Sequence, residues 1–222
     1  MSLPILRINK SSRHRNLLLV LISLFFLFPF IENIKTEISL VSLVFFAVIL
    51  ATFKTIKVDP KVSKWFWVFG INAFIMDLVL WMHSPGIIRH VVLTIFLLTY
   101  SGFLLFSLIL MIREIFTDDK VTSDTICAGV SIYLLIGFLW TLFYDIVNFL
   151  DKNAFHYAGV RDSVSLMYFS FTTLTTVGYG DIFPINKIAM SLSNLEAISG
   201  QIYLGVFVAR LVGLHLISSK KA

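Results

Sequence analysis

The chain is poor in cysteine and in charged residues. Cys127 is the only cysteine among 222 residues, so no disulfide can form within the chain. A lone cysteine also gives no zinc-site spacing. Charged residues make up 14% of the sequence, whereas soluble domains carry about 25%. So few charges cannot cover a water-facing surface of normal size, and the composition therefore excludes an ordinary soluble domain.

Patterns that indicate an enzyme are also missing. The sequence has no nucleophile paired with a base, no glycine-rich phosphate loop and no metal-ligand spacing. We therefore expect no catalytic residues and no resident cofactor. The net charge is +5, but the basic residues stand in short loops between apolar runs. We expect them to set membrane topology and not to bind nucleic acid.

Long apolar runs dominate what is present. Hydrophobic residues make up 58% of the chain, and Phe alone occurs 22 times. A bilayer core about 30 Å thick needs about 20 mostly apolar residues per spanning helix. The runs predict an all-α membrane protein with six transmembrane helices near residues 16–31, 37–53, 65–83, 87–112, 125–149 and 187–217. A further apolar segment at 164–177 is too short to cross and predicts a re-entrant helix.

Basic residues indicate the orientation of these helices. With the N-terminus inside, the outer segments hold Lys35, Arg89, Lys152, Arg161 and Lys187, and all other Lys and Arg residues lie inside or near the inner ends of helices. We expect both termini to be cytoplasmic. No small-residue cleavage site follows the first run, so we interpret it as a helix and not as a signal peptide. The short loops suggest a bacterial inner membrane protein, and we expect no soluble ligand-binding domain after the last helix.

The short apolar segment ends in the sequence TTVGYGD, from Thr175 to Asp181. This motif follows a short helix, lies between two predicted spanning helices and falls on the predicted outer side. Over about residues 163–205 the chain resembles tetrameric potassium channels, whose selectivity filter carries this sequence. The resemblance implies a re-entrant pore helix and a filter at the centre of a homotetramer, because one chain supplies one filter copy and four are needed to encircle an ion.

The resemblance assigns the filter to Thr176, Val177, Gly178, Tyr179 and Gly180. Backbone carbonyls of the first four would replace the water shell of K⁺, the only ligand expected. Successive peptides can all point inward only if the backbone alternates between right- and left-handed dihedrals. Glycine adopts the left-handed region without a Cβ penalty, which explains Gly178 and Gly180.

Several neighbours would support the filter in such a channel. The resemblance names Tyr168, Phe169, Thr172, Thr175 and Asp181. Tyr179 should pack against the aromatic pair at 168 and 169. Many relatives carry Trp at this pair, so here the Tyr168 hydroxyl would replace the indole donor to Asp181. Thr172 stands where some relatives have a buried glutamate.

The last predicted helix would line the cavity and the gate. The family positions are Gly200, Gln201, Leu204, Val208 and Val212. The last four recur at three- and four-residue steps and so share one helix face. Gly200 matches the hinge glycine of the family, but close helix packing explains it equally well.

Two charged residues of this helix need partners. Glu196 lies well round the helix from Gln201, and we expect a structural hydrogen bond to the pore helix, with Thr172 or Thr173 as the partner. Arg210 lies near the inner interface, where we expect it to reach the lipid headgroups.

The predicted fourth helix lacks the repeated arginines of a voltage sensor. It carries Arg89 and His90 near its outer end and Arg113 at its inner end, with no charge between them. We therefore predict weak or absent voltage gating. Asp77 in the preceding helix is level with Arg89 and could pair with it. Residues 1–113 would form a degenerate sensor-like domain, and residues 114–222 the pore domain.

Two other functions remain open at this point. A potassium transporter subunit is one, although such proteins join four pore repeats in one chain. A non-conducting partner of other channel subunits is the second. The gating stimulus also remains open among voltage, pH, membrane tension and a ligand, and the expected partners are lipids and further copies of the chain.

Overall fold

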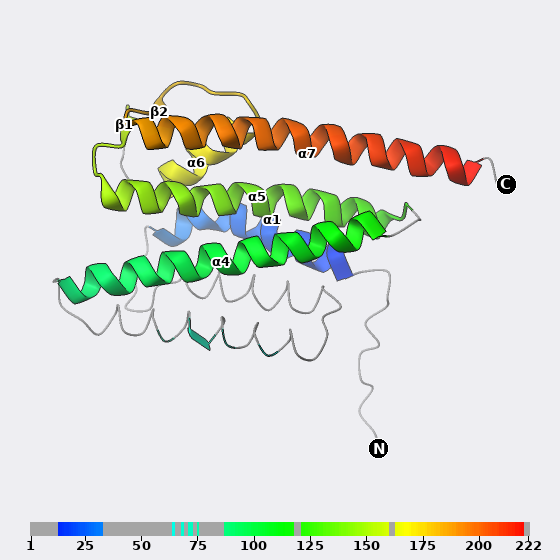
Figure 1. The fold of residues 1–222 in the computed structure, drawn as a ribbon, viewed down its shortest axis with the longest axis horizontal. Helices are drawn as coiled ribbons and strands as arrows, with labels where there is room; N and C mark the ends of the chain where they lie inside the picture. Colours follow the sequence, from blue (N-terminus) through cyan, green and yellow to red (C-terminus); the bar gives the residue numbers. More distant parts are fainter. Residues whose placement is uncertain are drawn as a thin grey trace, which may run out of the picture.

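The computed structural model describes residues 13–32, 87–117, 121–159 and 163–219, together with the isolated residues Lys64, Val68, Ile71, Asn72 and Ile75. The helices are α1 (Arg13–Glu32), α4 (Ile87–Thr117), α5 (Ser123–Leu150), α6 (Ser163–Leu174) and α7 (Lys187–Ser219). Two short strands are β1 (Phe155–Tyr157) and β2 (Ile182–Pro184) (Figure 1). The helix predicted near 37–53 lies outside the described residues, as does nearly all of the one near 65–83.

Within the described part of the chain, three helices are long and apolar enough to cross a membrane. They contain the spans Val91–Thr117, Ser123–Leu150 and Lys187–Leu214. Two shorter apolar helices cover His14–Leu27 and Val164–Leu174, and the second is the predicted short helix before the motif. These helices support a membrane protein, while the total of six crossings stays a prediction.

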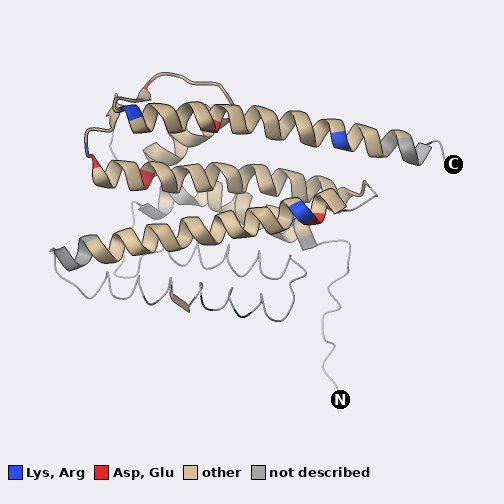
Figure 2. Ribbon diagram, in the orientation of Figure 1, with Lys and Arg blue, Asp and Glu red and all other residues tan. Residues whose placement is uncertain are grey.

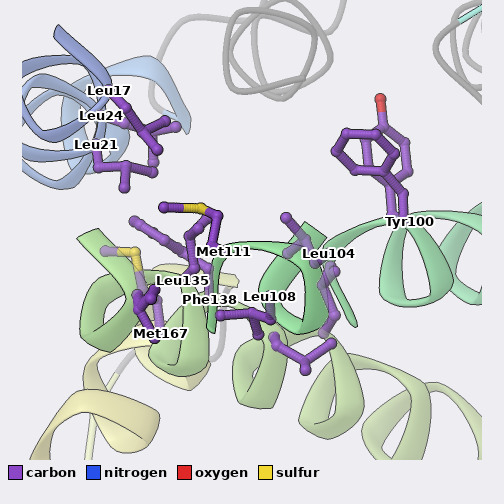
Figure 3. Close-up of a cluster of buried hydrophobic side chains, with 14 of the residues drawn as sticks. Leu17, Leu21, Leu24, Tyr100, Leu104, Leu108, Met111, Leu135, Phe138 and Met167 are labelled. Atoms are coloured by element: carbon purple, nitrogen blue, oxygen red, sulfur yellow. The ribbon is translucent and has the colours of Figure 1, made fainter. Parts of the chain in front are cut away.

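Helix α5 is the centre of the structure. It packs against α4 and α1 on one side and against α6 and α7 on the other (Figure 1). Figure 3 shows part of the shared apolar core, in which Leu21 of α1, Met111 of α4, Leu135 of α5 and Met167 of α6 belong to one cluster. The regions on either side of residue 113 therefore share a core, and within a membrane its helices are held together by close van der Waals packing.

A tertiary cap joins the starts of α1 and α5. Thr122 is the N-cap of α5, and it forms a capping box with Thr125. Asp124 in the same turn accepts hydrogen bonds from the His14 backbone N–H (3.2 Å) and from His14 Nδ1 (2.7 Å). One carboxylate therefore serves the first turn of its own helix and fixes the start of α1.

The two strands lie at the end of the structure where α5 ends and α7 begins. β1 and β2 pair antiparallel, with Tyr157 opposite Ile182. Asn186 accepts from the Ala189 N–H (2.7 Å) at the start of α7 and donates to Asp151 (2.8 Å) at the end of α5. This sheet was not predicted, because strands of three residues show too little alternation to be recognised.

Candidate functional site

The TTVGYGD segment follows α6 directly and is hydrogen-bonded to its last turn. The Thr172 carbonyl accepts hydrogen bonds from the Val177 N–H (2.9 Å) and the Gly178 N–H (3.2 Å), and the Thr173 carbonyl accepts from Thr176 (2.9 Å). These bonds satisfy carbonyls that a helix end leaves without partners. Thr172 therefore supports the segment through its backbone, whereas its hydroxyl donates to the Phe169 carbonyl (3.0 Å).

The backbone of this segment alternates in handedness. Gly178 has φ = 52° and Gly180 has φ = 80°, which confirms the left-handed positions predicted for both glycines. Thr176 also has a positive φ, 60°, and it is the only such non-glycine residue in the described part of the chain. A β-branched residue is strained in this region, at a cost of about 1–3 kcal/mol. The alternation expected from Gly178 and Gly180, continued two residues back, reaches Thr176, where no glycine relieves the strain.

Aromatic rings brace the outer part of the segment. The rings of Tyr168 and Tyr179 are stacked, with centroids 6.2 Å apart and planes 4° from parallel, which confirms the predicted packing. A hydrogen bond from the Tyr168 hydroxyl to Asp181, expected as the replacement of the indole donor, stays a prediction; Asp181 Oδ1 accepts from the Ile182 N–H (3.1 Å). Phe169, the other member of the expected aromatic pair, is buried against two other rings. Its ring centroid lies 5.0 Å from that of Tyr144 and 5.5 Å from that of Phe155.

The remaining side chains of the segment lie open in the single chain. Val177 is 53% exposed and Tyr179 is 72% exposed. Thr175 is exposed as well, and its hydroxyl donates to the Phe171 carbonyl (2.6 Å). Apolar and aromatic side chains with such exposure leave room for contacts with further copies of the chain.

Glu196 of α7 is fully buried behind this segment. Ser170 Oγ of α6 lies 2.6 Å from Glu196 Oε1, and the Tyr144 hydroxyl of α5 donates to Oε2 (2.5 Å). The expected bond to the pore helix is therefore present. The prediction of Thr172 or Thr173 as the partner was wrong, because the α6 hydroxyl that faces Glu196 belongs to Ser170.

Gly200 lies where α7 contacts the end of α6. A Cβ at this position would overlap the carbonyl oxygen of Leu174. The Tyr133 hydroxyl of α5 donates to the same oxygen (3.2 Å). Close packing therefore requires glycine here, which supports the packing interpretation of Gly200, while the hinge role stays a prediction.

The C-terminal half of α7 is attached to α5 and α4. The Tyr203 hydroxyl donates to the Gly129 carbonyl (2.7 Å). Arg210 donates through Nη2 to the carbonyls of Ile115 (3.0 Å) and Phe116 (2.8 Å), and its guanidinium lies 4.9 Å from the Phe116 ring centre. The last turn of α4 thus supplies Arg210 with protein partners, since its carbonyls need donors, and the expected contact with lipid headgroups stays a prediction.

Among the described residues, no element covers the opposite face of α7. It carries the residues predicted for the cavity: Gln201, Leu204, Val208 and Val212, all of them exposed. Val208 and Val212 are 55% and 54% exposed. This exposed stripe of α7 begins with the Gln201 amide and continues toward the C-terminus with apolar side chains.

The predicted intramembrane pair is not described. Asp77 lies outside the described residues, and Arg89 lies in the first turn of α4, where its side chain is not described. From Val91 to Ile112, α4 carries no charged residue (Figure 2). Across the described part of the chain, no three His, Cys, Asp or Glu side chains come together in a way that could hold a metal ion.

The region from α5 to α7 also matches known proteins. Residues 121–214 match the family model of an ion channel family. The chain is similar to the voltage-gated potassium channel Kch of Escherichia coli (strain K12), with 32% identity over 101 residues. That match covers 45% of this chain and 23% of Kch, so the chain spans about a quarter of the length of Kch. Both findings support an ion channel family and point to a channel and not to an enzyme.

Sequence reasoning missed the residues that hold the segment from behind. Ser170, Tyr144 and Tyr133 all bond to α7 or to the end of α6. A signal existed: polar groups inside apolar helices need partners, so each of these hydroxyls implied a contact. Which contact it makes depends on the packing of α5 and could not be read from spacing.

Proposed function

We propose that this chain is one subunit of a homotetrameric, potassium-selective channel that passes K⁺ down its gradient. The observation that carries the proposal is the alternation of left-handed dihedrals at Thr176, Gly178 and Gly180. A strand of this kind can direct successive carbonyls to one side, and four such strands around an axis would replace the hydration shell of an ion. In this function K⁺ binds at the carbonyls of Thr176, Val177, Gly178 and Tyr179.

The open stripe of α7 supports the same assembly. Four copies of α7 would place Gln201, Leu204, Val208 and Val212 around a common cavity below the filter. Rings of Leu or Val close such a pore by excluding water, and the Gln amide suits a hydrated ion. The C-terminal end of α6 carries partial negative charge, which favours a cation in that cavity.

We infer that voltage contributes little to gating. Moving one charge through 100 mV is worth about 2.3 kcal/mol, and true sensors move 3–4 charges per subunit. The uncharged stretch Val91–Ile112 of α4 offers none. The inner membrane of a bacterium, with both termini cytoplasmic, remains the proposed location.

A flux experiment tests the proposal. The purified protein is reconstituted into liposomes with a K⁺ gradient, and flux is measured with K⁺ or Na⁺ as the only permeant cation. We expect fast K⁺ flux, little Na⁺ flux and fourfold symmetric particles in electron microscopy. Equal flux of the two cations would contradict the proposal. Flux that stops without an added co-substrate would indicate a transporter subunit, and no flux from the purified chain would indicate a non-conducting partner.

A further inference from the structure

The hydrogen bonds around Glu196 need more protons than the neighbouring hydroxyls hold. Ser170 Oγ lies 2.6 Å from Glu196 Oε1 and 2.8 Å from the Gly137 carbonyl oxygen. The Tyr144 hydroxyl lies 2.5 Å from Glu196 Oε2. All three separations are hydrogen-bond lengths between oxygen atoms, and all three contacts are buried.

Each contact requires one hydrogen. Ser170 and Tyr144 each carry one O–H, whereas the Gly137 carbonyl and an ionised carboxylate can only accept. One O–H of Ser170 cannot point at both of its neighbours over such short distances. A proton on Glu196 Oε1 completes the count, because the acid then donates to Ser170 and Ser170 donates to Gly137.

Burial favours the same assignment. Glu196 is 0% exposed. No Lys, Arg or His of the described residues forms an ion pair with it, because the ion pairs found there join His14 to Glu114 and to Asp124. An unpaired charge buried in an apolar helix layer costs far more free energy than a neutral, hydrogen-bonded acid. We propose that Glu196 is a neutral carboxylic acid that donates a hydrogen bond to Ser170 and thereby positions α6 beneath the filter.

The bond acts on the carbonyl that holds the filter. Ser170 precedes Thr172 by two residues, and the Thr172 carbonyl accepts from the N–H groups of Val177 and Gly178. Glu196 is thus a positioning residue and contacts no ion. Its effect on selectivity rests on the proposed channel function, whereas its protonation does not.

An infrared difference spectrum tests the protonation. Wild-type protein and Glu196→Gln are compared in lipid at neutral pH. We expect the wild type to show a protonated-carboxyl C=O stretching band that the variant lacks. A carboxylate band in its place would overturn the assignment.

Ion flux tests the positioning. In Glu196→Gln the amide N–H₂ donates to Ser170 and the amide oxygen accepts from Tyr144, so we expect unchanged K⁺ over Na⁺ selectivity. Glu196→Met keeps the volume but removes the donor, and we expect relative Na⁺ permeability to rise about tenfold. Ser170→Ala removes the same hydrogen bond by deleting its partner on α6. This variant replaces Glu196→Met in the experiment if Glu196→Met does not fold.

Trp140→Phe is the matched control. It removes the hydrogen bond from Trp140 Nε1 to Ser199 (3.2 Å), which joins α5 to α7 within one turn of Glu196 but does not involve α6. We expect lower thermal stability and unchanged selectivity. Equal selectivity loss in Trp140→Phe and Glu196→Met, or loss in Glu196→Gln, would overturn the positioning role. If the wild type passes no K⁺, the proposed channel function fails and the positioning role fails with it. The infrared band would still show whether Glu196 is protonated.

Discussion

Gly200 of α7 lies against the carbonyl oxygen of Leu174, the last residue of α6, at a separation that leaves no room for a Cβ. Glycine within a helix costs about 1 kcal/mol relative to alanine. The contact explains why this cost is tolerated, because any side chain would push α7 away from the end of α6. The middle of α7 therefore packs directly against the end of α6.

Gly200→Ala should destabilise the protein. The new methyl group would overlap a backbone oxygen that cannot rotate away, which costs about 1–3 kcal/mol. Thermal unfolding followed by circular dichroism in detergent would measure it. Gly205→Ala is the control, because no described atom lies within 4 Å of its Cβ position, and it should be neutral or stabilising. Equal melting temperatures for the two variants would contradict the packing role.

Gly178→Ala should abolish K⁺ selectivity. The residue has φ = 52° with open space around it, so the effect would come from backbone strain of about 1–2 kcal/mol and not from a clash. Liposome flux of K⁺ and Na⁺ is the measurement. Gly102→Ala in α4, which has no positive φ and no neighbour within 4 Å, should leave flux unchanged. Selective flux in Gly178→Ala would refute the role of the dihedral alternation.

Arg210→Gln should change the open probability without changing selectivity. The guanidinium joins α7 to the last turn of α4 through two carbonyls, and hydrogen bonds to charged groups contribute about 1.5–3 kcal/mol. Losing them should shift the balance between open and closed states by about tenfold or more. Single-channel recordings measure the open fraction, and the reversal potential reports selectivity.

Phe116→Leu separates the two parts of that contact. It removes the ring beneath Arg210 but keeps the backbone carbonyl, so it should have a smaller effect than Arg210→Gln. A shift of the reversal potential in either variant would show that the contact acts on the filter and not on the gate.

Asp124→Ala should lower stability by about 1–2 kcal/mol. Its carboxylate accepts from the backbone and from the ring of His14, so its loss leaves the start of α1 without that acceptor and α5 without a first-turn acid. Thermal unfolding is the measurement. Arg15→Gln removes a neighbouring exposed charge and should melt like the wild type. A melting temperature of Asp124→Ala equal to that of Arg15→Gln would argue against the cap.

The local parts of this protein could be predicted. The apolar runs near 125–149 and 187–217 became α5 and α7, because a long apolar run in a membrane protein forms its hydrogen bonds within a helix. Gly178 and Gly180 were predicted at left-handed positions, since only glycine adopts them freely. Tyr168 was placed beside Tyr179, eleven positions along the chain, by resemblance to a known filter.

The partners of buried polar groups could not be predicted. Ser170 and Glu196 are 26 positions apart, Tyr144 and Glu196 are 52 apart, and Arg210 reaches a carbonyl 95 positions away. Sequence alone determined the membrane class, the short helix and the left-handed positions of Gly178 and Gly180, because these depend on hydropathy and on local sterics. Only the tertiary structure decided which hydroxyls meet Glu196 and which carbonyls meet Arg210, because those pairings depend on how α4, α5 and α6 rotate to bury their apolar faces.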